Sequence, residues 1–226
     1  MNDNVAFDLE KLKERPRARY IIGLDEAGRG PLAGPLSVGL FLQWEDAVFV
    51  EGVGDSKKLS PKKRQTLFAR LKREPGTLWR VILISPREVD RLNILEATRR
   101  GMASLISSLP AGVLAKSVIL TDAVKPGLPG ITVREVIRGD AFSYVVGCAS
   151  IAAKVIRDDY MDTAALRYPD FRFEQNKGYP TRHHQEMLRT LGPTPLHRKS
   201  YRPVKEALTA QIKEVFISGL NKEGKR

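Results

Sequence analysis

Four acidic residues occupy positions where a β-strand is expected to end. Asp25 and Glu26 follow the apolar run YIIGL, Asp122 follows KSVILT, and Asp140 comes after ITVREVI, an arginine and a glycine. A single acid at a strand end is commonly part of a loop. If the strands before Asp25 and Asp122 are neighbours, however, their carboxylates converge, and their repulsion needs compensation. A divalent cation supplies it, and an all-oxygen site selects Mg²⁺ or Mn²⁺.

The net charge of the chain indicates an anionic partner. Lys and Arg total 38 against 26 Asp and Glu, a formal charge of +12. A balance this basic favours nucleic acid, a membrane surface or an acidic protein, although a basic surface alone is also compatible with an ordinary soluble protein. A basic periphery around an acidic focus is the charge layout of a nuclease. The periphery attracts phosphates and the focus holds the metals.

The remaining composition suggests a cytoplasmic protein. Cys148 is the only cysteine, which excludes an intramolecular disulfide and a cysteine-based zinc cluster. The first residues carry mixed charges and no apolar run, unlike a secretory signal. No apolar run reaches the roughly 18 residues that a membrane span needs. We expect a monomer, since nothing in the sequence suggests an oligomer.

Strands and helices are expected in an order that brings the acids together. Apolar runs predict strands at 20–25, 35–44, 47–53, 78–84, 116–122 and 131–137, and the first three are close enough to form an antiparallel meander. Helices are expected to begin after the capping pairs Ser60-Pro61 and Ser85-Pro86, the second running to about 109. Further helical stretches are expected at about 141–168, with many small residues, and at 182–191 and 203–220. This pattern predicts an α/β fold with a mixed five- to six-stranded sheet flanked by helices.

The chain divides into three expected parts. Residues 1–19 form a polar N-terminal leader or short helix, 20–195 form the sheet domain, and 196–226 form a helical C-terminal extension. The last part begins within the proline-rich basic stretch LGPTPLHRKSYRP (191–203). Its lysines favour phosphate contacts, but an apolar stripe that includes Leu208 and Ile212 equally favours packing on the core.

Two glycine-rich segments resemble nucleotide-binding motifs. GRGPLA (28–33) fits the dinucleotide fingerprint G-x-G-x-x-G/A. That fingerprint requires a helix at the glycines, where Pro35 interrupts, and the neighbouring Asp25 and Glu26 would repel a pyrophosphate. GVGDSKKLS (52–60) lacks the glycine-to-lysine spacing of a phosphate loop. Neither motif therefore predicts nucleotide binding.

The chain resembles the type 2 ribonuclease H family, usually called ribonuclease HII, over about 20–204. The likeness is carried by ordered segments: DEAGRGPLAGP (25–35), GDSKKLSPKKR (54–64), EVDRLNILEAT (88–98), ILTDA (119–123), RGD (138–140), CASIAAKVIRD (148–158), NKGYPTRHH (176–184) and LHRKSYRP (196–203). The resemblance implies a ribonuclease H-like sheet with flanking helices and a helical C-terminal extension. Arg138 departs from the lysine that the family often has there, but the charge is kept.

The resemblance also implies roles for individual residues. The family's four metal-binding catalytic carboxylates match Asp25, Glu26, Asp122 and Asp140. Its glycine-arginine-glycine motif, which recognises a ribonucleotide and the neighbouring deoxynucleotide, matches Gly28, Arg29 and Gly30. Its junction-recognising tyrosine matches Tyr179, and segments associated with substrate phosphates contain Lys57, Ser150 and Lys154. The positions of His184 and His197 have no certain role, and we expect core or hydrogen-bonding histidines.

The implied activity is that of an endoribonuclease. The family cuts the RNA strand of RNA–DNA hybrids and cuts 5′ of single ribonucleotides in duplex DNA, using two divalent ions and leaving 5′-phosphate and 3′-hydroxyl ends. One alternative is a non-catalytic RNA-binding protein, although four acids in a phosphate-binding groove would weaken binding unless metals sit there. Another is a different ribonuclease H-like enzyme, such as an integrase or a resolvase, against which the motifs beyond the acids argue.

Overall fold

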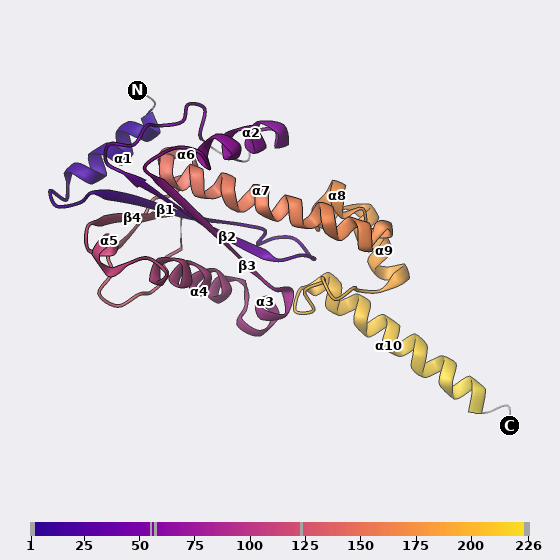
Figure 1. The fold of residues 1–226 in the computed structure, drawn as a ribbon. Helices are drawn as coiled ribbons and strands as arrows, with labels where there is room; N and C mark the ends of the chain where they lie inside the picture. The colour runs from indigo at the N-terminus through magenta and orange to yellow at the C-terminus, as the bar shows by residue number, and fades with distance from the viewer. Residues whose placement is uncertain (1–2, 55, 57, 123, 224–226) are drawn as a thin grey trace.

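The protein is built around one mixed sheet covered by helices on both faces (Figure 1). The computed structural model describes residues 3–54, 56, 58–122 and 124–223. The strands are β1 (Tyr20–Ala27), β2 (Leu36–Trp44), β3 (Thr77–Ile84), β4 (Ser117–Thr121) and β5 (Val133–Glu135). Their order in the sheet is β3-β2-β1-β4-β5, with β1 antiparallel to β2 and parallel to β4. The expected mixed sheet is confirmed, with five strands.

Helices connect and cover these strands. They are α1 (Asp3–Lys13), α2 (Pro61–Leu71), α3 (Pro86–Leu92), α4 (Ile94–Ser107), α5 (Ala111–Ala115), α6 (Gly139–Phe142), α7 (Tyr144–Arg167), α8 (Phe173–Asn176), α9 (Arg182–Leu191) and α10 (Arg202–Glu223), with a 3₁₀ turn, η1, at Pro169–Phe171. Among the described residues, no helix has the length and apolar composition needed to cross a membrane.

Alternating residues of the central strands build the two core layers, because successive side chains of a strand point to opposite faces. Ile21 packs in a cluster with residues of α1, α2 and α7, whereas Ile22 and Leu24 pack with residues of α3 and α4. The backbone of α7 lies so close to β1 that a Cβ at Gly23 would stand 2.2 Å from the carbonyl carbon of Val145. This contact fixes α7 against the middle of the sheet, with its side chains at a defined height above β1.

Three features of the expected secondary structure are wrong. The helix expected at about 141–168 is broken at Ser143, which has extended backbone, into α6 and α7. Residues 47–53 form no strand, and β3 takes the third place in the antiparallel part of the sheet. Val50 and Val53 are nevertheless buried, and the segment's backbone bonds to side chains: the amide of Val50 donates to Tyr144 Oη, and Asn4 donates to the carbonyl of Val53. The helix expected up to residue 109 is interrupted at Asn93, which has φ 64° and caps α4 by accepting from the amide of Glu96.

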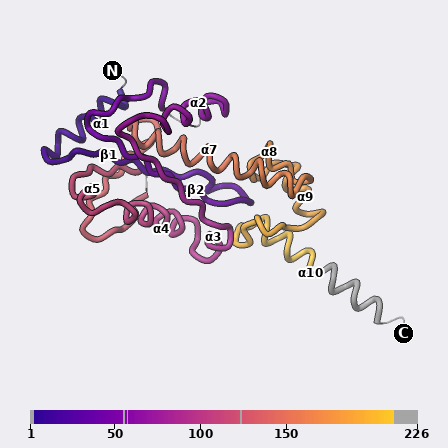
Figure 2. The backbone as a smooth tube through the Cα atoms, viewed as in Figure 1, coloured from indigo at the N-terminus to yellow at the C-terminus, as the bar shows by residue number. Residues whose placement is uncertain are grey.

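A third cluster joins the C-terminal elements to the far end of α7. It contains Leu32 of the β1–β2 connection, Phe171 and Phe173, Leu188 of α9 and Val204 of α10. In the tube view the β1–β2 connection extends towards α8 and α9 (Figure 2), where the amide of Leu32 donates to the carbonyl of Gly178 at 2.8 Å. The three-part division of the chain stays a prediction, and these contacts tie its second and third parts together.

Candidate active site

Parallel pairing of β1 with β4 brings distant carboxylates to one edge of the sheet. Leu24 pairs with Thr121, so Asp25, inside β1, and Asp122, directly after β4, lie side by side. Asp140 arrives on α6, where the amide of Gly139 donates to Asp122 Oδ1 at 3.2 Å. One oxygen of each of these three carboxylates lies within 4.8 Å of the others. The neighbour relation expected for the two strands is therefore confirmed.

The environment of Asp25 suits a cation. Its carboxyl is buried, and burial together with the charge of Glu26 raises its pKa well above the usual value. A hydrogen bond from Ser150 and one from the backbone of Glu26 act in the opposite direction. Oxygen donors alone make up the cluster, which is the donor set of Mg²⁺ or Mn²⁺. The residues present thus fit a hard divalent ion, which would offset the cost of burying these charges.

A cavity of about 340 Å³ opens beside these carboxylates. Its lining contains most of the residues singled out in the sequence: Asp25, Glu26, Ala27, Gly28, Arg29, Gly30, Ser56, Asp122, Ser150, Lys154 and Tyr179. Asp140 meets the other carboxylates without lining the cavity, and Lys57 lies outside the described residues. Carboxylates, hydroxyl groups, a lysine, a glycine turn and an aromatic ring therefore face one space.

One face of α7 contributes two polar side chains to the lining of this cavity. Ser150 and Lys154 are four residues apart, so they lie on the same face of the helix. Ser150 Oγ lies 2.7 Å from Ser56 Oγ, and Lys154 Nζ donates to Asp158 at 2.7 Å. Burial lowers the pKa of Lys154, and Asp158 partly offsets that effect. Ser56 was not predicted as a site residue, and its contact with Ser150 extends the hydrogen-bond chain that ends on Asp25.

Two buried arginines shape the turn between β1 and β2. The Arg198 guanidinium donates to the carbonyls of Gly28, Arg29 and Gly34 at 2.7, 3.0 and 3.0 Å. Arg157 donates to the carbonyls of Ala33 and Pro35, at 3.2 and 3.0 Å, from beneath the same turn.

Gly28 is required where this turn passes over Arg157. It has φ +92°, and a Cβ there would stand 2.1 Å from Arg157 Nε. Burial lowers the pKa of Arg157 to about 10, which leaves the guanidinium charged at neutral pH. Both arginines lie in segments that resemble the family, but no sequence signal separates them from exposed arginines.

Tyr179 lines the cavity beside Gly30. Its side chain is 43% exposed, and its ring lies 3.6 Å from where a Cβ of Gly30 would be. The loop that carries it passes through left-handed backbone at Lys177 and Gly178. His184 and His197 lie behind this loop, both buried and hydrogen-bonded to each other at 2.9 Å, which confirms the expectation of core histidines.

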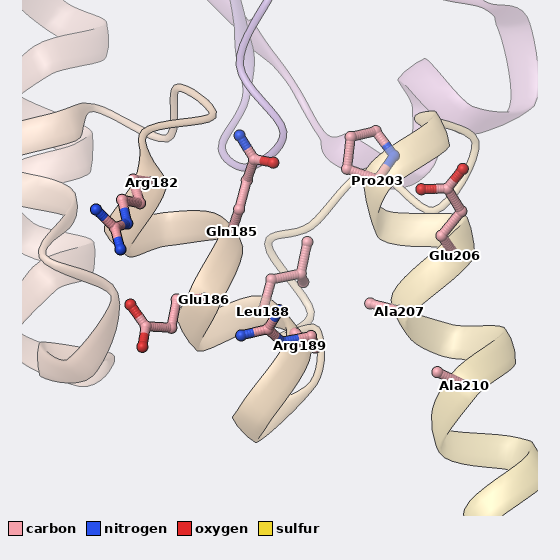
Figure 3. Close-up of a pocket in the computed structure, with 9 residues that line it drawn as sticks. All are labelled: Arg182, Gln185, Glu186, Leu188, Arg189, Pro203, Glu206, Ala207 and Ala210. Atoms are coloured by element: carbon pink, nitrogen blue, oxygen red, sulfur yellow. The ribbon is translucent and has the colours of Figure 1, made fainter.

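A larger cavity, of about 700 Å³, lies between α9 and α10 (Figure 3). Its lining combines two arginines, two glutamates and a glutamine with small and apolar side chains: Arg182, Gln185, Glu186, Leu188, Arg189, Pro203, Glu206, Ala207 and Ala210. None of the four carboxylates belongs to it. The smaller cavity is the candidate active site because the convergent chemistry lies there.

Known proteins match this chain over most of its length. The family model described as ribonuclease HII matches residues 22–204. A ribonuclease HII of Chlamydia pneumoniae is 41% identical, with 89% of this chain and 91% of that protein covered. A ribonuclease HII of Carboxydothermus hydrogenoformans is 39% identical, with 91% and 87% covered.

A solved structure agrees with these relatives. The crystal structure of the ribonuclease H2 from Pyrococcus horikoshii OT3 superposes with a TM-score of 0.68 at 28% identity, covering 83% of this chain and 96% of that one. The chain belongs to the ribonuclease HII family and is a metal-dependent ribonuclease.

Proposed function

We propose that this enzyme hydrolyses the RNA strand of RNA–DNA hybrids and cuts 5′ of single ribonucleotides embedded in duplex DNA, leaving 5′-phosphate and 3′-hydroxyl ends. The observation that supports this most directly is the shared cavity. A carboxylate cluster suited to metals and a glycine turn with an aromatic ring face one space, so one bound strand can meet both.

The four carboxylates hold the metals. Asp25, Glu26, Asp122 and Asp140 would hold two divalent ions, Mg²⁺ or Mn²⁺, which would supply activation of a water and stabilisation of the departing oxygen. Ser150 keeps the Asp25 carboxylate oriented through its hydrogen bond. The ammonium group of Lys154, held by Asp158, offers a positive charge to a substrate phosphate at the cavity wall. Lys57 is proposed for the same task from the sequence alone.

The turn and Tyr179 read the sugar. The 2′-hydroxyl distinguishes a ribonucleotide from a deoxynucleotide. Without side chains, Gly28 and Gly30 let the backbone of the turn come within hydrogen-bonding range of that hydroxyl, and Arg29 lies between them. The ring of Tyr179, which faces Gly30, offers a flat surface to the next sugar or base and a hydroxyl that can hydrogen-bond. Together they recognise the junction between a ribonucleotide and the DNA that follows.

Cleavage of a defined duplex tests the activity. The substrate is duplex DNA with one ribonucleotide, incubated with and without Mn²⁺. We expect metal-dependent cleavage 5′ of the ribonucleotide, whereas a non-catalytic RNA-binding protein would bind without cutting. Gel filtration at the same salt tests the proposed monomer, for which we expect the elution volume of a single chain of 25.3 kDa.

Replacing Tyr179 tests the reading of the junction. Tyr179→Ala should lower cleavage of the single-ribonucleotide duplex by roughly tenfold or more, since stacking on an aromatic ring is worth about 1–3 kcal/mol per base. A long hybrid offers many registers and should lose less. Tyr179→Phe keeps the ring and removes only the hydroxyl, so it measures the contribution of the hydroxyl to cleavage. Equal losses on both substrates would make Tyr179 a general contact.

A further inference from the structure

Two histidines form a buried pair behind the Tyr179 loop. His184, in the first turn of α9, is fully buried, His197 is 2% exposed, and their Nε2 atoms lie 2.9 Å apart. The rings of Phe171 and Phe173 enclose the pair, with centroids 5.0 to 6.0 Å from the two imidazoles. The pair therefore sits in an aromatic box closed to solvent.

The hydrogen-bond partners allow only one arrangement of protons. The backbone amide of Thr194 donates to His197 Nδ1 at 2.9 Å, so that nitrogen carries no proton. His197 therefore bears its proton on Nε2 and donates it to His184 Nε2. His184 must then carry its own proton on Nδ1, where the carbonyl of Tyr179 accepts at 2.8 Å. Both rings are neutral, in agreement with the burial that lowers their pKa values.

The chain of bonds runs in one direction, from the amide of Thr194 through His197 and His184 to the carbonyl of Tyr179. The preceding peptide is held from the other side, because the carbonyl of Gly178 accepts from the amide of Leu32 at 2.8 Å. Both peptide planes that flank the Cα of Tyr179 are thus anchored. Two further backbone bonds hold the same residue: the amide of Tyr179 donates to the carbonyl of Asn176, and the amide of Thr181 donates to the carbonyl of Tyr179, both at 2.8 Å. Together these bonds hold the backbone from which the 43% exposed ring leaves.

We propose that His184 is a positioning residue that acts through its Nδ1–H bond to the carbonyl of Tyr179, and that it thereby sets the preference of the enzyme for a single embedded ribonucleotide over a long hybrid. This inference rests on the proposed role of Tyr179 in reading the junction. The histidines touch no reacting atom. His184 acts on the substrate only through the angle at which the tyrosine ring faces Gly30 and the cavity.

Two variants of His184 with side chains of similar shape distinguish the effects of its two ring hydrogen bonds, one to Tyr179 and one to His197. In His184→Asn the side-chain amide occupies the place of Nδ1 and can still donate to the carbonyl of Tyr179, but the bond to His197 is lost. In His184→Gln the amide occupies the place of Nε2 and can still meet His197, but the bond to Tyr179 is lost. Both remove a ring from the aromatic box, so general destabilisation affects both alike. His183→Asn is the matched control, because that neighbouring histidine is half-exposed and bonds only to the carbonyl of Asp170 among the bonds described.

The measured quantity is the ratio of kcat/KM on the single-ribonucleotide duplex to kcat/KM on a long hybrid. We expect His184→Gln to lower this ratio by about tenfold, and His184→Asn and His183→Asn to leave it within about twofold of the unmodified enzyme. Melting temperatures recorded in parallel identify variants that fail to fold. If Asn and Gln lower the ratio equally at equal melting temperature, or if neither changes it, the positioning role is overturned.

Tyr179→Ala, measured in the same series, distinguishes the two proposals. If Tyr179→Ala leaves the ratio unchanged, Tyr179 does not read the junction, and both the proposed recognition and the positioning role fail. If Tyr179→Ala lowers the ratio but the two His184 variants behave alike, only the positioning role fails. If His184 acts through Tyr179, adding His184→Gln to Tyr179→Ala should cause no further loss of the ratio.

Discussion

At the scale of single residues, the groups that shape the site were harder to predict than the groups that line it. The four carboxylates could be selected because acids that converge from several strand ends repel one another and need a cation to compensate that repulsion. Arg157 and Arg198 could not, since an arginine in a motif looks the same whether it is exposed or buried. Both are buried and donate to carbonyls of the turn at 28–35. Burial depends on tertiary packing, which one sequence does not display.

Replacing a metal ligand should separate binding from chemistry. We expect Asp122→Asn and Asp140→Asn each to abolish most cleavage, because each removes a charge from the cluster that holds the metals. Binding of a hybrid should stay within a few-fold, since the basic surface is unchanged. Cleavage assays with Mn²⁺ and binding titrations with a labelled hybrid check this. Normal turnover by either variant would remove that residue from the site.

Lysine should not be able to replace Arg198, whose planar guanidinium donates to three carbonyls of the turn. Arg198→Lys keeps a positive charge but cannot donate to three carbonyls in a fixed plane. Each missing bond from a charged donor is worth roughly 1.5–3 kcal/mol, so the melting temperature should fall by several degrees and cleavage by at least about tenfold. Arg202→Lys, at an exposed position of α10, is the control. Equal behaviour of the two variants would contradict the structural role.

At the scale of elements, local sequence signals predicted where helices begin, whereas tertiary contacts decided which segments form strands and where helices are interrupted. Helices begin after Ser60 and Ser85 as expected, because capping involves only neighbouring residues. The segment 47–53 has the composition of a strand, yet side chains of Tyr144 and Asn4 occupy its backbone groups in place of a ladder. The break at Asn93 does have a local signal, an Asn-x-x-Glu cap, but the helical pattern on both sides of it conceals the boundary.

The N-terminal helix contributes a buried acid to the start of α7. Asp8 accepts from the amide of Val145 at 2.9 Å, and burial raises its pKa from 3.8 to about 7. The unfolded chain therefore releases this proton near pH 4, while the folded protein keeps it to about pH 7. The contribution of this group to the free energy of unfolding is complete below pH 4 and is lost as the pH rises to 7. The loss is at most roughly 4 kcal/mol.

Asp8→Asn should remove that pH dependence, because the amide stays neutral and its oxygen can still accept from Val145. We expect the melting temperature of the unmodified protein to fall relative to that of Asp8→Asn between pH 5 and pH 8. Asp3→Asn, on the exposed side of the same helix, should follow the unmodified protein. A constant difference between Asp8→Asn and the unmodified protein at all pH values would show that Asp8 does not titrate in this range.

At the scale of the whole molecule, charge and the C-terminal helix govern how nucleic acid is approached. The chain carries a net charge of +12, and its last fourteen residues carry four cations, Lys213, Lys222, Lys225 and Arg226, against Glu214 and Glu223. In Figure 1 α10 leads away from the sheet, while Val204 and Leu208 near its start pack on the third core cluster. The sequence could not show which part of this helix packs, because its apolar stripe continues past these two residues.

Removing residues 213–226 should weaken binding without unfolding the protein. A stop after Ile212 keeps Val204 and Leu208 in place, and a stop after Pro203 would not. We expect the slope of log affinity against log salt to fall by about 0.9 for each phosphate that the shortened protein no longer neutralises, with an unchanged melting temperature. Titrations of a hybrid at several salt concentrations measure it. An unchanged slope with a lower melting temperature would indicate that this part of the helix packs instead.

The pairing of β1 with β4 also has a kinetic consequence. Tyr20 pairs with Ser117, and the turn beside Asp25 is held by Arg198. The chain between Tyr20 and Ser117 must close before this pair can form, which costs chain entropy. We therefore expect this pairing to form late in folding. A chain still emerging from the ribosome, or one partly unfolded by heat, presents neither the metal ligands nor the turn as a set. Nuclease activity is therefore confined to the completed fold, and on refolding it should never return before the native near-ultraviolet signal.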